Sequence, residues 1–308
     1  MRRLDTPLAE RLGVRFPIVQ APMAYASPPA LPIAVSNAGA LGSIAGAPLS
    51  PDELRTAIRA VRAATDGPFA VNVFAQPYLL DGQIDAILEA RPPVVSFTFG
   101  VVDPAPLLEA GIAVLGTATT VEEARELERA GVDAVVAQGA EAGGHRGTFL
   151  GSFDDGLVPL AELVPAVVSS VSVPVIAAGG IADGSEIADQ LAAGAQGISL
   201  GTAFLFTPEC AVPPEWLDAL RRHDTVVTDA YSGRPARAAR TPFLEELMAG
   251  APPLPFPEQR EAVKARPDAE RFFLGGTGAP RARELGAGDL VRTLVVEAES
   301  AGRGSLRR

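Results

Sequence analysis

Short apolar runs recur along the first two hundred residues of the chain, and each run ends in small or polar residues. Runs of roughly four to eight apolar residues between turn-forming residues are typical of strands that are buried on both faces of a parallel sheet. The runs cover residues 17–23, 41–46, 69–74, 94–100, 113–118, 134–139, 174–180 and 197–204.

Amphipathic segments with helix signals lie between these runs. The segment 50–65 begins with Ser50, has Pro51 just inside, and carries acidic residues in its first turn, as helix starts often do. The segments 120–131 and 184–195 follow the same logic and end near glycines. The pattern therefore predicts strands and helices that alternate.

Alternation of buried strands with helices indicates a parallel α/β sheet. Eight such units in about 200 residues match a (β/α)₈ barrel, known as a TIM barrel. A doubly wound open sheet is the alternative, but it requires a GxGxxG turn after its first strand. Here that strand runs into Ala21, Pro22, Met23 and Ala24, which favours the barrel.

The alternation stops after about residue 207, and a proline-rich, irregular region follows with helical patches at 214–222 and 241–250. The segment 289–300 is amphipathic again. We therefore expect a barrel over 1–207, a small helical lid domain over 208–288, and a helix that closes the barrel, followed by a tail, over 289–308.

Composition narrows the class of protein. The 308 residues are 47% hydrophobic and 20% charged, with a net charge of −11 and Lys264 as the only lysine. An acidic chain without a basic cluster is not expected to bind nucleic acid. The single cysteine, Cys210, fits a reducing compartment. Without a signal peptide or a long apolar run, we expect a soluble, cytoplasmic protein that has no membrane partner.

The candidate chemistry gathers in the stretch AVVAQGAEAGGHRG, residues 134–147. Gly143 and Gly144 let the backbone approach a ligand closely because neither has a Cβ, and His145 follows them. The connection from the strand at 134 to the strand at 174 is also longer than the others. Active sites of barrels lie in the loops after the strands, so we expect His145 to belong to the active site.

Two further turns suggest a phosphate site. Gly179-Gly180 follows the strand at 174, and Gly201-Thr202 lies in the last strand run. In barrels, the loops after strands seven and eight commonly bind phosphate. Two strand amides, Asn72 and Gln138, face the same end, and together with the backbone of 21–24 they suit a flat polar ring such as a flavin.

Other kinds of site are poorly supported. His223 and Cys210 have no metal-ligand spacing, no GxSxG elbow of a hydrolase is present, and Asp154-Asp155 is typical of a solvated loop.

Several separated motifs together resemble the nitronate monooxygenases, formerly called 2-nitropropane dioxygenases. They are PIVQAPMA, GALGSIAGA, FAVNVF, VSFTFG, GVDAVVAQGAEAGGHRGTF, VPVIAAGGIADG and GISLGTAFL, with a weaker continuation in YSGRPAR. The resemblance implies an FMN-dependent barrel with a second domain. The residues then expected to bind FMN are Pro22, Met23, Ala24, Asn72, Gln138, Gly143, Gly144, Gly179, Gly180, Ser199, Leu200, Gly201 and Thr202.

The resemblance also implies a reaction, the oxidation of an alkyl nitronate by FMN and O₂ to a carbonyl compound and nitrite. His145 would be the catalytic residue, either as a base on a nitroalkane or as a contact to the nitronate, with a pKa near its ordinary value. The segment YSGRPAR would supply Ser232, together with Arg234 or Arg237, as contacts to an anionic substrate, although the arginines could equally only hold the lid against the barrel. Family members carry Tyr-Pro and Gly-Gln-Gly in the second domain, where this chain has Phe256-Pro257 and Gly276-Thr277-Gly278, and polar substrate contacts would be lost there.

Two alternatives stay open. The EAGGH loop is similar in flavin-type enoyl-acyl-carrier-protein reductases, and quinone reductases are built alike, so the chain could instead use NAD(P)H. A barrel that binds FMN without catalysis is the other alternative. An oligomer is possible in each case.

Overall fold

A computed structural model of the chain describes residues 4–304. The predicted tail therefore lies partly outside the described residues, as does the start of the predicted barrel segment. The barrel strands are β1 (Ile18–Gln20), β2 (Gly42–Ala45), β3 (Phe69–Phe74), β4 (Val94–Thr98), β5 (Ala113–Ala118), β6 (Ala134–Gln138), β8 (Val175–Ala178) and β9 (Gly197–Leu200).

The eight strands form one parallel sheet in the order β1-β9-β8-β6-β5-β4-β3-β2. A parallel bridge between Val19 and Leu41 joins the two outer strands, and Leu41 N–H donates to the Ile18 carbonyl across it at 2.9 Å. These contacts close the sheet on itself. The prediction of a TIM barrel is confirmed.

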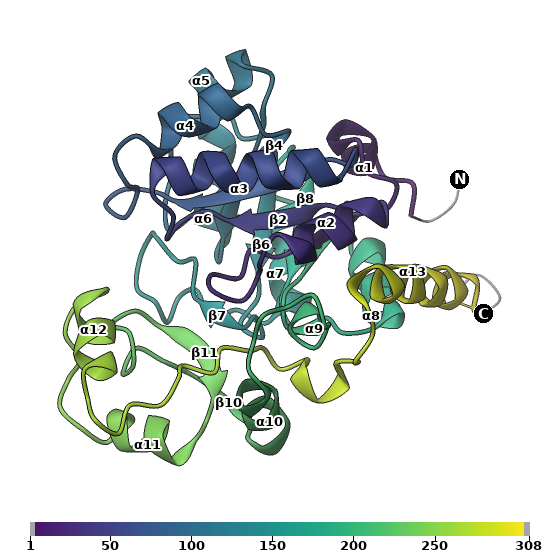
Figure 1. Cartoon of the computed structure of the whole chain (residues 1–308). Coiled ribbons are helices and arrows are strands. Elements are labelled where there is room, and N and C mark those ends of the chain that lie inside the picture. The colour runs from purple at the N-terminus through teal and green to yellow at the C-terminus, as the bar shows by residue number, and fades with distance from the viewer. Residues whose placement is uncertain (1–3, 305–308) are drawn as a thin grey trace.

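Helices surround the strands (Figure 1). Those of the barrel are α1 (Pro7–Leu12), α2 (Ala30–Asn37), α3 (Pro51–Ala64), α4 (Gln83–Ala90), α5 (Ala105–Glu109), α6 (Val121–Ala130), α7 (Leu160–Val168), α8 (Gly184–Ala192) and α9 (Thr202–Leu205). The Ser50 side chain and Glu53 form a reciprocal capping box at the start of α3. The last predicted strand run is shorter than expected, because its residues from Thr202 onward form α9.

The barrel interior is apolar at the end where the strands begin. Strand side chains that include Val19, Leu41, Val94 and Leu115 pack there with Leu8 and Leu12 of α1. A much larger apolar cluster joins strands and helices. The start of the barrel is thus filled and the carboxyl ends of the strands are left for function, as in other barrels.

The region after α9 contains more sheet than the sequence predicts. Its helices are α10 (Pro214–Arg222), α11 (Pro242–Met248), α12 (Glu258–Lys264) and a 3₁₀ turn (Ala279–Arg281), but β10 (Thr225–Thr228) and β11 (Ala236–Ala239) form an antiparallel pair. β11 also pairs with β7 (Gly144–His145), which lies in the long connection after β6. The expectation of an irregular, helical segment therefore missed a three-stranded sheet.

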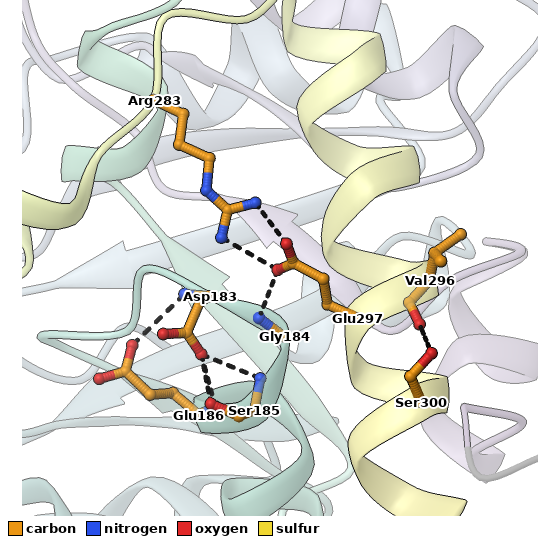
Figure 2. A network of polar contacts seen from close by, with 8 residues as sticks. All are labelled: Asp183, Gly184, Ser185, Glu186, Arg283, Val296, Glu297 and Ser300. Atoms are coloured by element: carbon orange, nitrogen blue, oxygen red, sulfur yellow. Dashed lines mark hydrogen bonds and ion pairs between the residues drawn. The ribbon is translucent and has the colours of Figure 1, made fainter.

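α13 (Ala287–Gly304) returns to the barrel and packs against α8 and α2. A Cβ on Gly184 would lie 2.2 Å from Glu297 Cβ, so only glycine permits this approach of the two helices. Glu297 accepts a bond from Gly184 N–H at 3.1 Å and forms a two-point ion pair with Arg283 (Figure 2). We call these contacts the α8–α13 seam.

None of the helices in residues 4–304 combines the length and the apolar character needed to span a bilayer.

Candidate active site

His145 lies in a strand and not in a free loop. Gly144 and His145 form β7, and His145 pairs with Ala236 of β11. The next residue, Arg146, donates its N–H to the Pro235 carbonyl at 2.8 Å. The hairpin of the second sheet therefore fixes the backbone that carries the imidazole, which the sequence pattern did not predict.

The ring of His145 is oriented by Ser232. Nε2 of His145 lies 3.0 Å from Ser232 Oγ, and that hydroxyl donates to the Arg234 carbonyl at 2.9 Å. A serine hydroxyl has one proton to donate, so its oxygen accepts from His145 and the imidazole proton is on Nε2. Nδ1 then carries the lone pair.

The surroundings of His145 keep it neutral. Burial, followed by the positive charges of Arg234 and Arg260, lowers the pKa of His145 from 6.5 to about 3. The expectation of a pKa near the ordinary value is therefore wrong for the chain without ligands. The main physical reason is that burial of the imidazole disfavours its charged form, and the two nearby cations add to this effect.

Aromatic rings surround His145. The ring centroids of Phe256, Phe272 and Phe99 lie 5.4, 6.2 and 6.3 Å from the imidazole centroid. Tyr78 contacts two of these rings, Phe256 at 5.1 Å and Phe99 at 5.9 Å. We call Tyr78, Phe99, Phe256 and Phe272 the aromatic wall.

Phe99 has a strained backbone, which the sequence gives no sign of. Its φ of 77° lies in the left-handed region, where a bulky side chain is a genuine outlier. Such strain tends to gather at functional sites because the surrounding structure must hold it in place. Here it directs a ring toward His145.

Buried side chains hold the connection from β6 to α7. Arg146 has no exposed surface, and its guanidinium donates to the carbonyls of Gly139, Gln138 and Gly156 at 2.7, 2.8 and 2.9 Å. Burial is the largest cause that lowers its pKa to about 10. Arg146 therefore replaces the sheet partners that these loop carbonyls lack.

Gln138 serves the same connection. Its Nε2 donates to the His145 carbonyl at 3.1 Å, and its Oε1 accepts from Gly147 N–H at 2.8 Å. On the other side of the connection, Glu123 of α6 accepts the N–H groups of Phe149 and Leu150. Gln138, which the sequence analysis expects to contact a flavin, therefore positions His145 in the structure.

Four glycine-rich segments meet at the carboxyl ends of the strands. A Cβ on Gly143 would lie 2.4 Å from Gly276 N, and a Cβ on Gly180 would lie 2.8 Å from Glu141 Cβ. Gly276 N–H donates to Thr202 Oγ1 at 2.8 Å. Residues 275–278 therefore join the two predicted phosphate turns and the loop before His145, in what we call the glycine cradle.

Gly201 differs from the other glycines of the cradle. A Cβ there would meet only Ala21 Cβ at 3.5 Å and Met23 Sδ at 3.9 Å, both ordinary contacts. Gly201 therefore borders the predicted flavin loop, Pro22 to Ala24, across space that a side chain would occupy. Ser199 and Leu200 are buried just before it in β9. The structure brings these predicted cofactor residues together.

Asn72 is buried in β3, as predicted. Its Nδ2 donates to Ser96 O, Ser96 Oγ and Thr98 Oγ1 at 3.0–3.1 Å. These bonds fix the amide, and Oδ1 accepts none of them, so Oδ1 is the atom that faces a ligand donor if one binds.

Sequence analysis missed Gln20, which is fully buried at the end of β1. Its Oε1 accepts Ser43 N–H at 2.8 Å, so it links β1 to β2 at the carboxyl ends of the strands. The sequence signal that could have identified Gln20 is a polar residue inside the apolar run PIVQAPM.

Other candidates lie away from this centre. His223 follows the last residue of α10, and Asp155 accepts bonds from Ser152 in the long connection. A hollow of about 380 Å³ lies at the opposite end of the strands, with Gly13, Arg62 and Asp66 in its lining. Residues 4–304 contain no group of three or more histidine, cysteine or acidic side chains arranged for a metal.

Comparison with known proteins gives consistent matches. The family model described as nitronate monooxygenase matches residues 5–81 and 77–297. A nitronate monooxygenase of Pseudomonas aeruginosa is 41% identical, with 93% of this chain and 97% of the relative aligned. A probable nitronate monooxygenase of Staphylococcus aureus is 38% identical over 84% of this chain and 85% of the relative.

Two solved structures share the whole architecture. Nitroalkane oxidase from Streptomyces ansochromogenes superposes with a TM-score of 0.89 at 39% identity, covering 97% of this chain and 99% of that one. FabK from Thermotoga maritima has a TM-score of 0.83 at 34% identity, with 98% of each chain covered.

Proposed function

The chain is an oxidoreductase that belongs to the nitronate monooxygenase family, and we propose that it oxidises alkyl nitronates with FMN and O₂ to a carbonyl compound and nitrite. The observation that carries the proposal is the neutral, Ser232-bound imidazole of His145 beside the glycine cradle. Small nitroalkanes are a second substrate class if His145 removes their proton.

The cradle supports FMN as the cofactor. Glycines at 143, 180 and 276 bring backbone close together, and Thr202 adds a hydroxyl; backbone N–H groups and hydroxyls are common phosphate ligands. The space beside Gly201 and the flavin loop suits the rest of the molecule. When bound, FMN would take electrons from the substrate and pass them to O₂.

The protein's own groups would act on the substrate. Nδ1 of His145 carries the lone pair, so it can accept the proton of a neutral nitroalkane, while Ser232 holds the ring through Nε2. A nitronate has already lost that proton. A neutral imidazole between arginines then leaves a positive field for an anion.

We also propose that 1–207 form the cofactor-binding barrel, that 208–288 form a lid that covers the substrate, and that 289–308 close the barrel. A cytoplasmic location and an oligomeric state stay predictions.

Absorption of the purified protein tests the proposal. We expect flavin bands, and we expect them to bleach, or a semiquinone to appear, on anaerobic addition of ethyl nitronate but not of NADH. Bleaching by NADH alone would favour a reductase. A flavin that responds to neither would favour a binding protein, and a colourless protein that ignores added FMN would contradict the cofactor assignment.

Thr202→Asp tests the phosphate site. The new carboxylate can still accept the Gly276 N–H, but it would repel a phosphate, so we expect the purified variant to be colourless. Thr202→Ser keeps the hydroxyl and should stay yellow. Retained colour in Thr202→Asp would contradict this position of the phosphate.

A further inference from the structure

The aromatic wall around His145 contains one hydroxyl. Phe99, Phe256 and Phe272 offer only hydrocarbon, while Tyr78 presents a phenol between Phe99 and Phe256. Tyr78 comes from the connection after β3, on the barrel side, and Phe256 comes from the lid side. An apolar wall with one donor suits a small ligand that has a polar head and an apolar body.

Arg234 lies behind this wall. Its side chain is 7% exposed, and its guanidinium carbon is 3.8 Å from the centroid of the Phe99 ring. Nε donates to the Arg146 carbonyl at 3.2 Å and Nη2 to the Thr148 carbonyl at 2.6 Å. These acceptors are neutral carbonyls, and Glu123 is the acid whose charge acts on Arg234.

Tyr78 and Arg234 act on each other. Burial lowers the pKa of Arg234, and the largest effects in the opposite direction come from the oxygen of Tyr78. Phe99 contacts both groups, with the guanidinium carbon 3.8 Å and the Tyr78 ring centroid 5.9 Å from its own ring centroid. At this separation the phenol oxygen can accept from the guanidinium, which leaves its own O–H to donate. A donor supported by a buried cation is well suited to the oxygen of an anion.

The charge of Arg234 also bears on His145. It is among the causes that hold the imidazole neutral, so the two groups are near neighbours that do not pair with each other. A negative ligand would be attracted by this buried positive charge, because the dielectric constant inside the protein is low.

We propose that Tyr78, supported by Arg234, binds the oxygen atoms of the substrate's anionic head group and makes the site selective for small monoanions. This inference rests on the proposed function, and it makes Tyr78 a specificity-determining residue for the nitronate. Arg234 contributes the charge and positions the phenol.

Nitrate is a suitable probe, because it is a planar monoanion with oxygens on nitrogen and is not oxidised. Its dissociation constant is measured by calorimetry on the purified wild type and on Tyr78→Phe. Loss of one hydrogen bond to a charged group should weaken nitrate binding roughly tenfold or more. The KM for ethyl nitronate should rise by a similar factor, with a smaller change in kcat.

Tyr25→Phe is the matched control, since it removes the same atom from a side chain that is 70% exposed. It should bind nitrate as the wild type does. Arg234→Lys keeps the charge but loses the planar fork, and we expect weaker nitrate binding with the flavin bands and the circular dichroism unchanged. Circular dichroism also identifies a variant that has failed to fold, and Tyr78→Phe then carries the test.

The outcomes separate the two proposals. If the protein oxidises nitronate but Tyr78→Phe binds nitrate within twofold of the wild-type affinity, the anion contact is overturned and the proposed function stands. Absence of nitronate oxidation, with nitrate binding that depends on Tyr78, would overturn the function and leave the contact. A wild type that binds no nitrate would overturn the contact.

Discussion

Two regions of this molecule use arginine in opposite ways. In the α8–α13 seam, Arg283 pairs with Glu297 (Figure 2), and these side chains are 30% and 36% exposed. Around His145, Arg146 and Arg234 are 0% and 7% exposed, and their hydrogen bonds go mainly to main-chain carbonyl oxygens. The first arrangement cancels charge, and the second orders a loop but keeps its charge.

The difference bears on our proposal that a chain with a net charge of −11 binds an anionic substrate. Carbonyl partners satisfy most of the buried guanidinium N–H groups, although Nε of Arg146 has no hydrogen-bond partner. They do not remove the positive charge, which acts over several ångströms at low dielectric. The positive charges that act on His145 come from Arg234 and Arg260, which lie outside the connection that carries it.

Arg146→Met should have the largest effect. It leaves three loop carbonyls buried without their partner, and we expect a loss of about 3–5 kcal/mol in the free energy of unfolding, measured by urea denaturation. Arg283→Met in the seam is the matched control and should cost under about 1 kcal/mol, because exposed ion pairs contribute little. Equal losses would remove the contrast between the two regions.

Glycines sharpen the comparison. Gly184→Ala places a Cβ 2.2 Å from Glu297 Cβ and 2.4 Å from Ala298 N, so α8 and α13 must separate, at a cost of about 1–3 kcal/mol. Gly201→Ala meets no such clash and should keep its stability while binding FMN more weakly. Urea denaturation and flavin titration measure the two effects. An unchanged free energy of unfolding in Gly184→Ala would show that α8 and α13 can move apart at little cost.

The pH dependence of stability gives a smaller effect. The pKa of His145 is lowered to about 3 in the folded state, whereas it is about 6.5 in the unfolded chain. Between these two values the imidazole is protonated in the unfolded chain and neutral in the folded one. Stability then falls as the pH drops from about 6.5 toward 3. At pH 5.5 we expect the free energy of unfolding of His145→Asn to gain about 1.4 kcal/mol on the wild type, compared with their difference at pH 8. No such gain would mean that His145 titrates normally.

The barrel could be predicted from the sequence because its signals are local. β3 spans the predicted run 69–74, and α10 spans 214–222, since apolar runs and proline helix starts act over a few residues. The grouping of the glycine turns followed from the fold, because parallel strands bring their carboxyl ends to one rim.

What the sequence did not predict depends on distant partners. β11 reads ARAA, a weak strand pattern, and it forms because β10 and β7 pair with it. The burial of Arg146 is equally hidden, because its three carbonyl partners become available only when the connection folds back. The lowered pKa of His145 follows from the same folding, which brings Arg234 and Arg260 near it.

The most direct test of the account is steady-state turnover of nitroethane and of ethyl nitronate by His145→Asn, with flavin content measured in the same sample. We predict full flavin content and a loss of roughly 10²–10⁴-fold in kcat/KM for nitroethane, which needs a base, with a much smaller loss for the nitronate. Unchanged turnover of nitroethane would contradict the central claim that this chain positions His145 for catalysis.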